Sequence, residues 1–224
     1  MIRAVFFDYD GVLTTDKTGS LTTNRYLSQA AGVDFSKIQT VFGRFSRDLT
    51  LGKTTHTQIW QEVCDELAQD IGINILHEAF ESTPINEGMF LLARQLKDSY
   101  SVGIITDNKK DRIDHLKRTQ ALETLFNPIV VSAEIGGNKQ SAEIFSYALD
   151  CAKVLAEESV FIDNNQENLV APKALGIKTV FHDDEANDIA ALVSTLKTLG
   201  VVATMPNNSI QGIASELAPP DFKR

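Results

Sequence analysis

The most constraining feature of the sequence is a short apolar run near the N-terminus that ends in two carboxylates. Residues 4–7, Ala-Val-Phe-Phe, show no polar alternation, which is typical of a strand buried on both faces of a parallel sheet. Asp8 follows the run directly, Asp10 comes two residues later, and Gly11 allows a tight turn. Open α/β sheets bind their ligands at the carboxyl ends of the strands. The run therefore predicts an α/β fold with both acids at its ligand-binding edge.

Two carboxylates this close repel each other unless a cation or a shared proton offsets their charge. Mg²⁺ suits such a pair, because it prefers hard oxygen ligands and often binds through one or two carboxylates plus a substrate phosphate. The alternative is that Asp8 and Asp10 are ordinary loop acids, since Asp is common in turns. The residue types alone leave both interpretations open.

Beyond Pro84 the sequence alternates between helical and strand patterns, which predicts a sheet with helices packed on it. We expect residues 1–16 and 85–203 to form this core domain, followed by a tail of unknown role over 204–224. The further strands are expected over residues 101–106, 127–132, 160–163 and 177–181, and the longest helices over 141–158 and 188–199.

The segment over residues 17–84 has helical spacing without strand alternation, so we expect an inserted helical domain there. Thr22 or Thr23 is the expected N-cap of its first helix, and Gly32 the residue that ends this helix. Most aromatic residues of the insert fit a packed bundle core.

Three cations of the insert are candidates for contact with an anionic substrate: Arg44, Arg47 and Lys53. A guanidinium matches the geometry of a phosphate or carboxylate group. The alternative is that these charges face solvent.

Polar residues follow the later strands at the same sheet edge. Thr106 ends the second strand, and Asp107 and Asn108 lead into a helix whose free amides can hold phosphate oxygens; a helix cap is the alternative role of Thr106. Lys139 lies at the expected start of the 141–158 helix, where a cation opposes the helix dipole unless it faces an anion. These positions predict an anion site at this edge.

The segment Asp8-Tyr9-Asp10-Gly11-Val12-Leu13 resembles the first motif of the haloacid dehalogenase-like (HAD) hydrolases. Counterparts of three further family motifs follow in the same order at Thr106, Lys139 and Asp163, so the resemblance covers roughly residues 1–200. It implies a Rossmann-like parallel sheet in the order 5-4-1-2-3, with right-handed crossovers. It also implies that the helical insert is a cap domain of the subfamily I (C1) type, which covers the active site.

The resemblance implies roles for the site residues as well. Asp8 is the expected nucleophile and Asp10 the general acid and base. Thr106 and Lys139 are expected to hold the transferring phosphoryl group, together with Asp107 and Asn108.

The expected Mg²⁺ ligands are Asp8, Asp10, Asp163 and Asn164. The sequence departs from the family pattern at Asn164, where a second acid is usual, and at Gln140, where Pro often follows the lysine. An amide can ligate through its carbonyl oxygen, and Glu167 is a reserve carboxylate nearby. We therefore expect a functional but weak metal site.

The activity that these features predict is Mg²⁺-dependent hydrolysis of a small phosphorylated metabolite through an aspartyl-phosphate intermediate. A phosphosugar mutase similar to β-phosphoglucomutase is one alternative. A non-catalytic phosphate-binding or regulatory protein is another, and Asn164 is its only hint. A dehalogenase is disfavoured, because carbon–halogen chemistry would leave Asp10 without a task.

The net charge of −9 argues against a nucleic-acid partner, which would require clustered cations. No run of 18 apolar residues occurs, so we expect a soluble, cytoplasmic monomer or homodimer without a membrane partner. Cys64 and Cys151 lack metal-site spacing and are expected to be reduced packing residues. We also expect structural or surface roles for the isolated histidines, His56, His77, His115 and His182.

Overall fold

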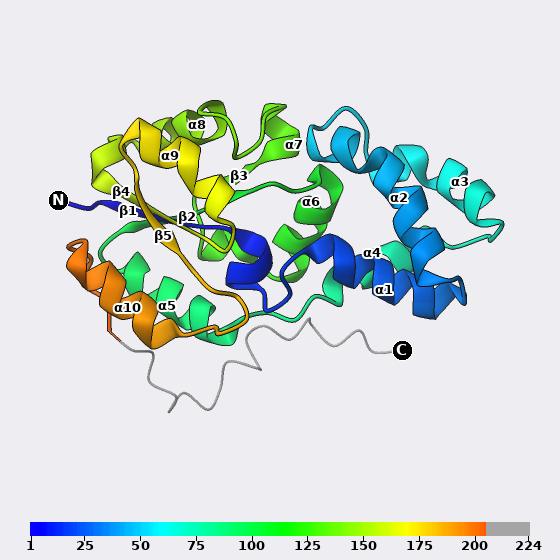
Figure 1. Ribbon diagram of the computed structural model, residues 1–224, viewed down its shortest axis with the longest axis horizontal. Helices are drawn as coiled ribbons and strands as arrows, with labels where there is room; N and C mark the ends of the chain where they lie inside the picture. The colour runs from blue at the N-terminus through cyan, green and yellow to red at the C-terminus, as the bar shows by residue number, and fades with distance from the viewer. Residues whose placement is uncertain (205–224) are drawn as a thin grey trace.

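The computed structural model describes residues 1–204 and is built around one five-stranded parallel sheet. The strand order is β3-β2-β1-β4-β5, with β1 (Ala4–Phe7) at the centre (Figure 1). This is the predicted order read from the other edge, so the expected fold is confirmed. The other strands are β2 (Ser101–Thr106), β3 (Ile129–Val131), β4 (Ser159–Asp163) and β5 (Lys178–Phe181).

Helices cover both faces of the sheet, which explains why all four residues of β1 are buried. Because strand side chains alternate, Val5 and Phe7 pack on one face and Ala4 and Phe6 on the other. The first face carries α5 (Glu87–Lys97), α6 (Lys110–Thr119) and α10 (Ile189–Thr198). The second carries α8 (Glu143–Ala152) and α9 (Val170–Leu175), and Figure 1 shows the two layers.

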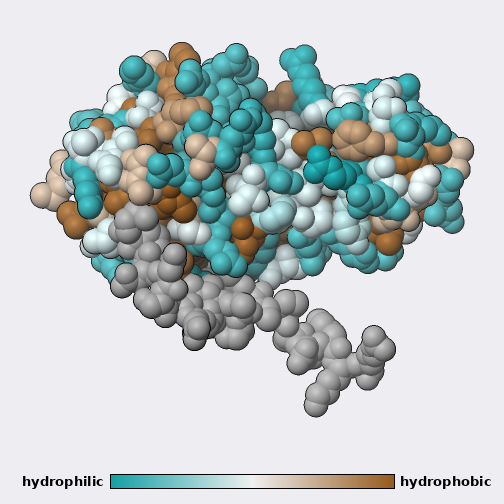
Figure 2. Space-filling view, turned by 60° about the horizontal axis from the view of Figure 1, so that its bottom comes forward, coloured by the Kyte–Doolittle hydropathy of each residue, from teal (hydrophilic) through white to brown (hydrophobic). Residues whose placement is uncertain are grey.

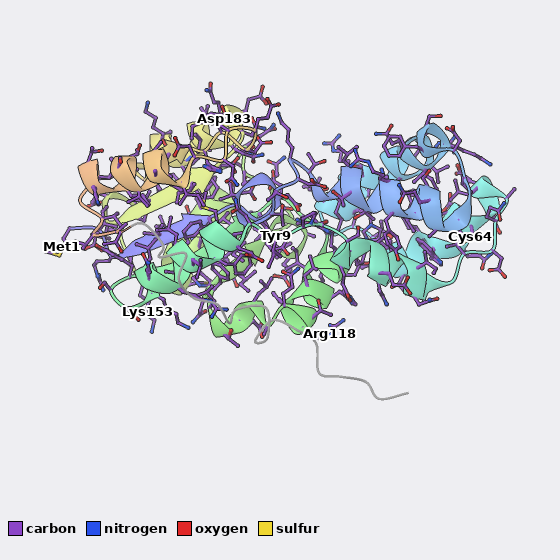
Figure 3. The ribbon with its side chains drawn as sticks, turned by 90° about the horizontal axis from the view of Figure 1, so that it is seen from below. Met1, Tyr9, Cys64, Arg118, Lys153 and Asp183 are labelled. Atoms are coloured by element: carbon purple, nitrogen blue, oxygen red, sulfur yellow. The ribbon has the colours of Figure 1, made fainter. Side chains whose placement is uncertain are left out.

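The remaining four long helices lie together to one side of the sheet (Figure 1). They are α1 (Gly19–Ala31), α2 (Phe35–Thr50), α3 (His56–Leu67) and α4 (Ile73–Glu81). Their buried residues form a separate hydrophobic core that includes Leu27, Ile38, Trp60 and Phe80. Cys64, labelled in Figure 3, belongs to this core at the far side of the insert from the sheet. The helical insert thus folds around its own apolar residues.

Two segments join the insert to the sheet, and they run side by side. The Thr15 amide donates to the Pro84 carbonyl at 3.0 Å, and the Asn86 amide donates to the Leu13 carbonyl at 2.8 Å. Thr14 and Ile85 form an antiparallel bridge between these bonds. The paired segments fix where the insert leaves and re-enters the sheet domain.

Three local expectations are wrong. Thr18, not Thr22 or Thr23, is the N-cap of α1, because the helix starts one turn earlier and buries both later threonines. Lys139 does not start a helix: α8 begins only at Glu143, so the dipole argument does not apply to this lysine. The α8 helix also ends at Ala152 rather than near residue 158, because Lys153 adopts a left-handed conformation with a φ of 54°.

The described residues also contain short helical turns: η1 (Tyr9–Leu13), η2 (Leu122–Thr124), α7 (Ser132–Ile135), η3 (Ala156–Glu158) and η4 (Gln166–Leu169). Cys64 is buried as expected, but Cys151 is exposed on α8 and is not a packing residue. Within residues 1–204, none of the helices combines the length and apolar character that a bilayer crossing requires. Residues 205–224, nearly all of the expected tail, lie outside the described residues.

The large apolar residues are mostly inside the molecule. On the face seen in Figure 2, hydrophobic residues appear as small groups among hydrophilic ones. Scattered exposed apolar residues of this kind are usual for a globular surface.

Candidate active site

The two carboxylates of the first motif stand where β1 ends, as the sequence predicts. The Asp8 backbone amide continues the sheet ladder by donating to the Ile162 carbonyl at 2.9 Å, and the residue is 5 % exposed. The chain then turns through η1, where Gly11 has a φ of 80°. A Cβ on Gly11 would lie 2.0 Å from the amide nitrogen of Asn164. Glycine is therefore required there by both conformation and space.

Lys139 connects the acids of the first and fourth motifs. Its Nζ lies 2.8 Å from an Asp8 oxygen and 2.6 Å from an Asp163 oxygen, and the side chain is fully buried. Burial alone would lower the pKa of Lys139, but the charges of Asp8 and Asp163 outweigh burial and raise it. The lysine is thus a permanent cation at the centre of the site. Its backbone amide donates to Asp107 at 3.0 Å, which holds the loop before α8 in place.

Asp163 is saturated with hydrogen bonds. Besides the bond from Lys139, its carboxylate accepts from the Asn165 amide at 2.7 Å and from the Asn168 side chain at 3.2 Å. Asn168 was not singled out from the sequence, although its place one turn into the segment after β4 could have indicated it. In this arrangement Asp163 positions Lys139 rather than offering free oxygens.

Burial is the main influence on Asp8. It raises the pKa of Asp8 to about 7, the charges of Asp163 and Asp10 act in the same direction, and Lys139 opposes them. The carboxyl group is therefore poised near neutral pH mainly by its burial, with a smaller contribution from the neighbouring carboxylates. A cation brought to this edge would favour the ionised, nucleophilic form.

Asp10 is held by a residue that the sequence did not reveal. Arg112 on α6 donates to both carboxylate oxygens, at 2.8 and 2.9 Å, and Asn108 adds a bond of 2.9 Å. Burial alone would raise the pKa of Asp10, but the charge and hydrogen bonds of Arg112 outweigh it and hold the pKa below its usual range. Arg112 is 2 % exposed, so this is a buried ion pair. The spacing of the apolar residues on α6 predicts an apolar face of this helix, but it does not predict the contact between Arg112 and Asp10.

The second-motif residues lie beside the acids. The buried Thr106 hydroxyl accepts a hydrogen bond from the Asn108 side chain at 3.4 Å. The Asn108 backbone amide donates to the Ser132 hydroxyl at 3.0 Å. The Ser132 hydroxyl in turn donates to the Thr50 carbonyl of the insert at 2.8 Å. This chain of bonds ties the strand end to the helical insert.

The acids, the lysine and the threonine open onto one cavity of about 710 Å³. Lys17 and Thr18 line it from the segment that enters the insert, and Gln166 and Asn168 line it from the loop after β4. The predicted site residues that share this cavity are Asp8, Asp10, Thr106, Asp107, Lys139 and Asn164.

The three candidate cations of the insert do not line this cavity. Arg44 lies on α2, is exposed and pairs with Glu66, and Arg47 is exposed on the same helix. Lys53 pairs with Asp48 at 3.4 Å. None of the three lines the cavity, so their expected contact with substrate has no support in this arrangement, whereas solvent exposure fits it. Glu167 is also exposed and outside the lining.

The donor set for Mg²⁺ is present in part. Among residues 1–204, no group of three or more His, Cys, Asp or Glu side chains has metal-binding geometry. The Asn164 side-chain amide lies against the Gly11 turn and donates to Asp184 at 3.3 Å, and Asn164 lines the same cavity as both motif acids. One carboxylate, an amide oxygen, a backbone carbonyl and waters are a set that Mg²⁺ accepts when substrate phosphate completes it. Burial is the main cause of the raised pKa of Asp8, and the charges of Asp163 and Asp10, which add to it, would also favour a bound cation.

Comparison with known proteins gives a consistent result. The family model for haloacid dehalogenase-like hydrolases matches residues 5–182. The bifunctional epoxide hydrolase 2 of Rattus norvegicus is 26 % identical over 231 residues, which cover 92 % of this chain and 41 % of that protein. The chain thus spans less than half the length of this curated relative.

Solved structures of HAD proteins share the fold. A HAD family enzyme from Bacteroides thetaiotaomicron, in complex with magnesium and inorganic phosphate, superposes with a TM-score of 0.71 and 20 % identity over 86 % of this chain and 99 % of that one. A HAD phosphatase from Thermococcus onnurineus gives a TM-score of 0.61 and 19 % identity over 91 % and 100 % of the chains. At these identities the likeness shows the fold alone.

Proposed function

This chain belongs to the haloacid dehalogenase-like hydrolase family, and we propose that it is a Mg²⁺-dependent phosphomonoesterase that acts on a small phosphorylated metabolite. The observation that carries the proposal is the pairing of Asp8 with a buried Lys139 at 2.8 Å, at the wall of the cavity that also contains Thr106. A carboxylate beside a fixed cation and a hydroxyl is suited to receive a phosphoryl group.

In the first step, an Asp8 oxygen attacks phosphorus, and the bond from phosphorus to the leaving oxygen breaks. Because Arg112 holds the pKa of Asp10 below its usual range, Asp10 takes up a proton from solvent before the first turnover. It then gives this proton to the leaving oxygen, so the alcohol leaves neutral. Lys139 and the Thr106 hydroxyl hold the phosphoryl oxygens during the transfer. Asp8 is then an acyl phosphate.

In the second step, Asp10 removes a proton from water, and the water oxygen attacks phosphorus. The bond between the Asp8 oxygen and phosphorus breaks, which releases inorganic phosphate and restores the Asp8 carboxylate. Asp10 ends the cycle protonated, ready for the next leaving group. Arg112 keeps the Asp10 carboxyl oriented throughout, since both of its oxygens are held.

Asp8, the Asp10 backbone carbonyl and the Asn164 side chain are the groups that would hold Mg²⁺. When bound, the ion supplies charge neutralisation for the phosphate. Structures of relatives support this part of the proposal, because the Bacteroides thetaiotaomicron enzyme was solved with magnesium and phosphate. We further propose that the α1–α4 insert acts as a cap, since it faces the same cavity through Lys17, Thr18 and Ser20.

The test is a panel of phosphorylated metabolites and p-nitrophenyl phosphate, assayed for released phosphate with Mg²⁺ and with excess chelator. We expect phosphate release that requires the metal. A product isomer without free phosphate would instead indicate the mutase, and no turnover of any substrate would indicate a phosphate-binding protein.

Replacing Asp10 by Asn is expected to lower kcat by about 10²- to 10⁴-fold, the usual contribution of positioned proton transfer. The change also leaves Arg112 without its carboxylate partner, so the variant should be less stable. Kinetics should therefore be measured at a temperature where circular dichroism shows both proteins folded. A folded Asp10→Asn protein with wild-type kcat on an alkyl phosphate would contradict the acid–base role.

Asn164→Asp is expected to lower the Mg²⁺ concentration that gives half-maximal activity. The wild-type midpoint should be on the order of millimolar, because a neutral amide attracts the ion less than a carboxylate does. Asp163→Ala should raise the midpoint or abolish turnover, since it also frees Lys139. Titrating the rate against Mg²⁺ in the three proteins decides the point: an unchanged midpoint in Asn164→Asp would place this side chain outside the metal shell.

A further inference from the structure

The side-chain amide of Asn164 has a partner that sequence patterns did not indicate. Its Nδ2 donates to an Asp184 carboxylate oxygen at 3.3 Å, and Asp184 lies 20 residues further along the chain, in the loop after β5. Strands β4 and β5 pair in parallel, so the loops that follow them leave the sheet side by side. Asn164 lines the catalytic cavity, and Asp184 is partly buried next to it. Asp184 thus contacts the amide without lining the cavity itself.

This contact decides how the Asn164 amide is oriented. A side-chain amide has an acceptor oxygen at one end and donor hydrogens at the other, whereas a carboxylate only accepts hydrogen bonds. Nδ2 must therefore face Asp184. A Cβ built on Gly11 would also lie closer to Nδ2 than to Oδ1, at 2.0 Å against 3.2 Å. Both neighbours meet the nitrogen end, so the oxygen end is left to face the cavity that Asn164 lines.

The orientation matters because position 164 departs from the family pattern. A carboxylate at this position presents an acceptor oxygen to a cation in either orientation, but an amide presents donor hydrogens when it is rotated by half a turn. The rotated amide repels a cation. Asn164 therefore needs a fixed acceptor at its nitrogen end, and the Asp184 carboxylate is one that carries a full negative charge. A hydrogen bond to a carboxylate also strengthens the amide oxygen as an acceptor.

The loop that carries Asp184 is held by its own hydrogen bonds. Asp183, labelled in Figure 3 at the surface of the sheet domain, accepts from the backbone amides of Glu185 and Ala186 at 3.0 and 3.1 Å. These bonds close a turn around Asp184. The turn ends at Asn187, whose φ of 44° is uncommon for a residue other than glycine. The backbone around Asp184 is therefore fixed by local interactions.

Asn187 also ties this loop to the first motif. Its side-chain oxygen accepts from Asn86 Nδ2 at 2.8 Å, and the same Asn86 nitrogen donates to the Val12 carbonyl at 3.1 Å. Val12 belongs to the η1 turn that contains Gly11. One side chain thus connects the turn that packs on Asn164 with the loop that carries Asp184. The amide and its acceptor are held in one framework.

We propose that Asp184 is a positioning residue for the Mg²⁺ site. It fixes the Asn164 amide with Oδ1 toward the cavity, and so compensates, from the neighbouring loop, for the acid that the family usually has at position 164. The proposal rests on the proposed function, because it assumes that Asn164 holds Mg²⁺. Loss of such a supporting hydrogen bond typically lowers metal affinity by roughly tenfold to a hundredfold. Because Asp184 is only partly buried, we expect the lower end of this range.

The test measures the Mg²⁺ dissociation constant without substrate, from the rise in Tm as Mg²⁺ is added at constant ionic strength. Asp184→Ala should raise this constant by roughly tenfold, because the amide can then rotate. Asp184→Asn should stay within about threefold of the wild type, since its own carbonyl oxygen can still accept from Asn164. Glu185→Ala is the matched control, because it removes a carboxylate from an exposed position in the same turn.

The second arm repeats Asp184→Ala in the Asn164→Asp protein. A carboxylate at position 164 has no donor end, so removing Asp184 should change the dissociation constant by less than about twofold in this background. If Asp184 acted only through its charge or through the fold, the loss would be about the same in both backgrounds, and the positioning role would be overturned. Should Asp184→Ala fail to fold, Asp184→Leu, which is of similar size and has no acceptor, takes its place.

The outcomes separate this inference from the proposed function. An unchanged dissociation constant in Asp184→Ala would contradict the positioning role and leave the metal-dependent phosphatase standing. Binding by Asp184→Asn that is as weak as binding by Asp184→Ala would also contradict it, because the charge and not the orientation would then be the cause. A wild-type protein whose Tm does not respond to Mg²⁺ would overturn both the metal-dependent function and this inference.

Discussion

Replacing Asp8 by Asn is expected to lower phosphatase turnover by on the order of 10⁴-fold or more, the largest effect of any single substitution in this chain. An amide is nearly the same size as the carboxylate but cannot form the acyl phosphate. The variant should still fold, because Lys139 keeps its bond to Asp163. The measurement is phosphate release under single-turnover conditions with Mg²⁺.

The Asp8→Asn variant is expected to lose turnover but not stability. Because burial raises the pKa of Asp8 to about 7, its ionised form is unfavourable in the folded state at pH 8. Asp8→Asn removes that charge and should be at least as resistant to urea as the wild type at this pH. Asp98→Asn, at an exposed position, serves as the control for both assays. Substantial turnover by a folded Asp8→Asn protein would rule out the aspartyl-phosphate mechanism.

The second large effect is expected from Lys139→Met, which removes the buried cation but keeps the length of the side chain. Asp8 and Asp163 then lose their shared partner, and breaking a buried pair from one side typically costs about 3–5 kcal/mol. Turnover should also fall by roughly 10²- to 10³-fold, since a group that holds the transferring phosphoryl oxygens is lost. Urea unfolding and phosphate release measure the two losses.

The loss of stability in this variant should depend on pH in a defined direction. Without the lysine, the folded-state pKa of Asp8 rises further above its unfolded value, so the folded protein binds more protons than the unfolded one. Stability then falls as pH rises, from the unfolded pKa of about 4 to beyond the wild-type folded value of about 7. The deficit relative to wild type should therefore be larger at pH 8 than at pH 5. Lys173→Met, at an exposed position on α9, should show no such trend, and a pH-independent deficit in Lys139→Met would contradict the assigned charge pairing.

Local sequence patterns were enough to predict the sheet and most of the catalytic edge. The apolar run before Asp8 required a strand buried on both faces, and alternation after Pro84 required helices on either side of a parallel sheet. Thr106 and Asp163 could be placed beside Asp8 because strand ends are readable from local pattern and parallel strands bring their ends to one edge. Lys139 was placed there by the family motif, since the helix start expected at this position was wrong.

The partners of these groups, in contrast, depend on how distant parts of the chain pack together. Arg112 and Asp10 are 102 residues apart, and helical spacing shows which face of α6 is apolar but not which acid its arginine meets. The partner of Arg44 could not be predicted for the same reason. Its guanidinium matches the geometry of a phosphate, but in the structure it pairs with Glu66. The full lining of the catalytic cavity was equally beyond the sequence, because it comes from segments far apart in the chain whose packing no local pattern specifies. Local periodicity fixes elements and faces, whereas ion pairs and cavities depend on long-range packing between them.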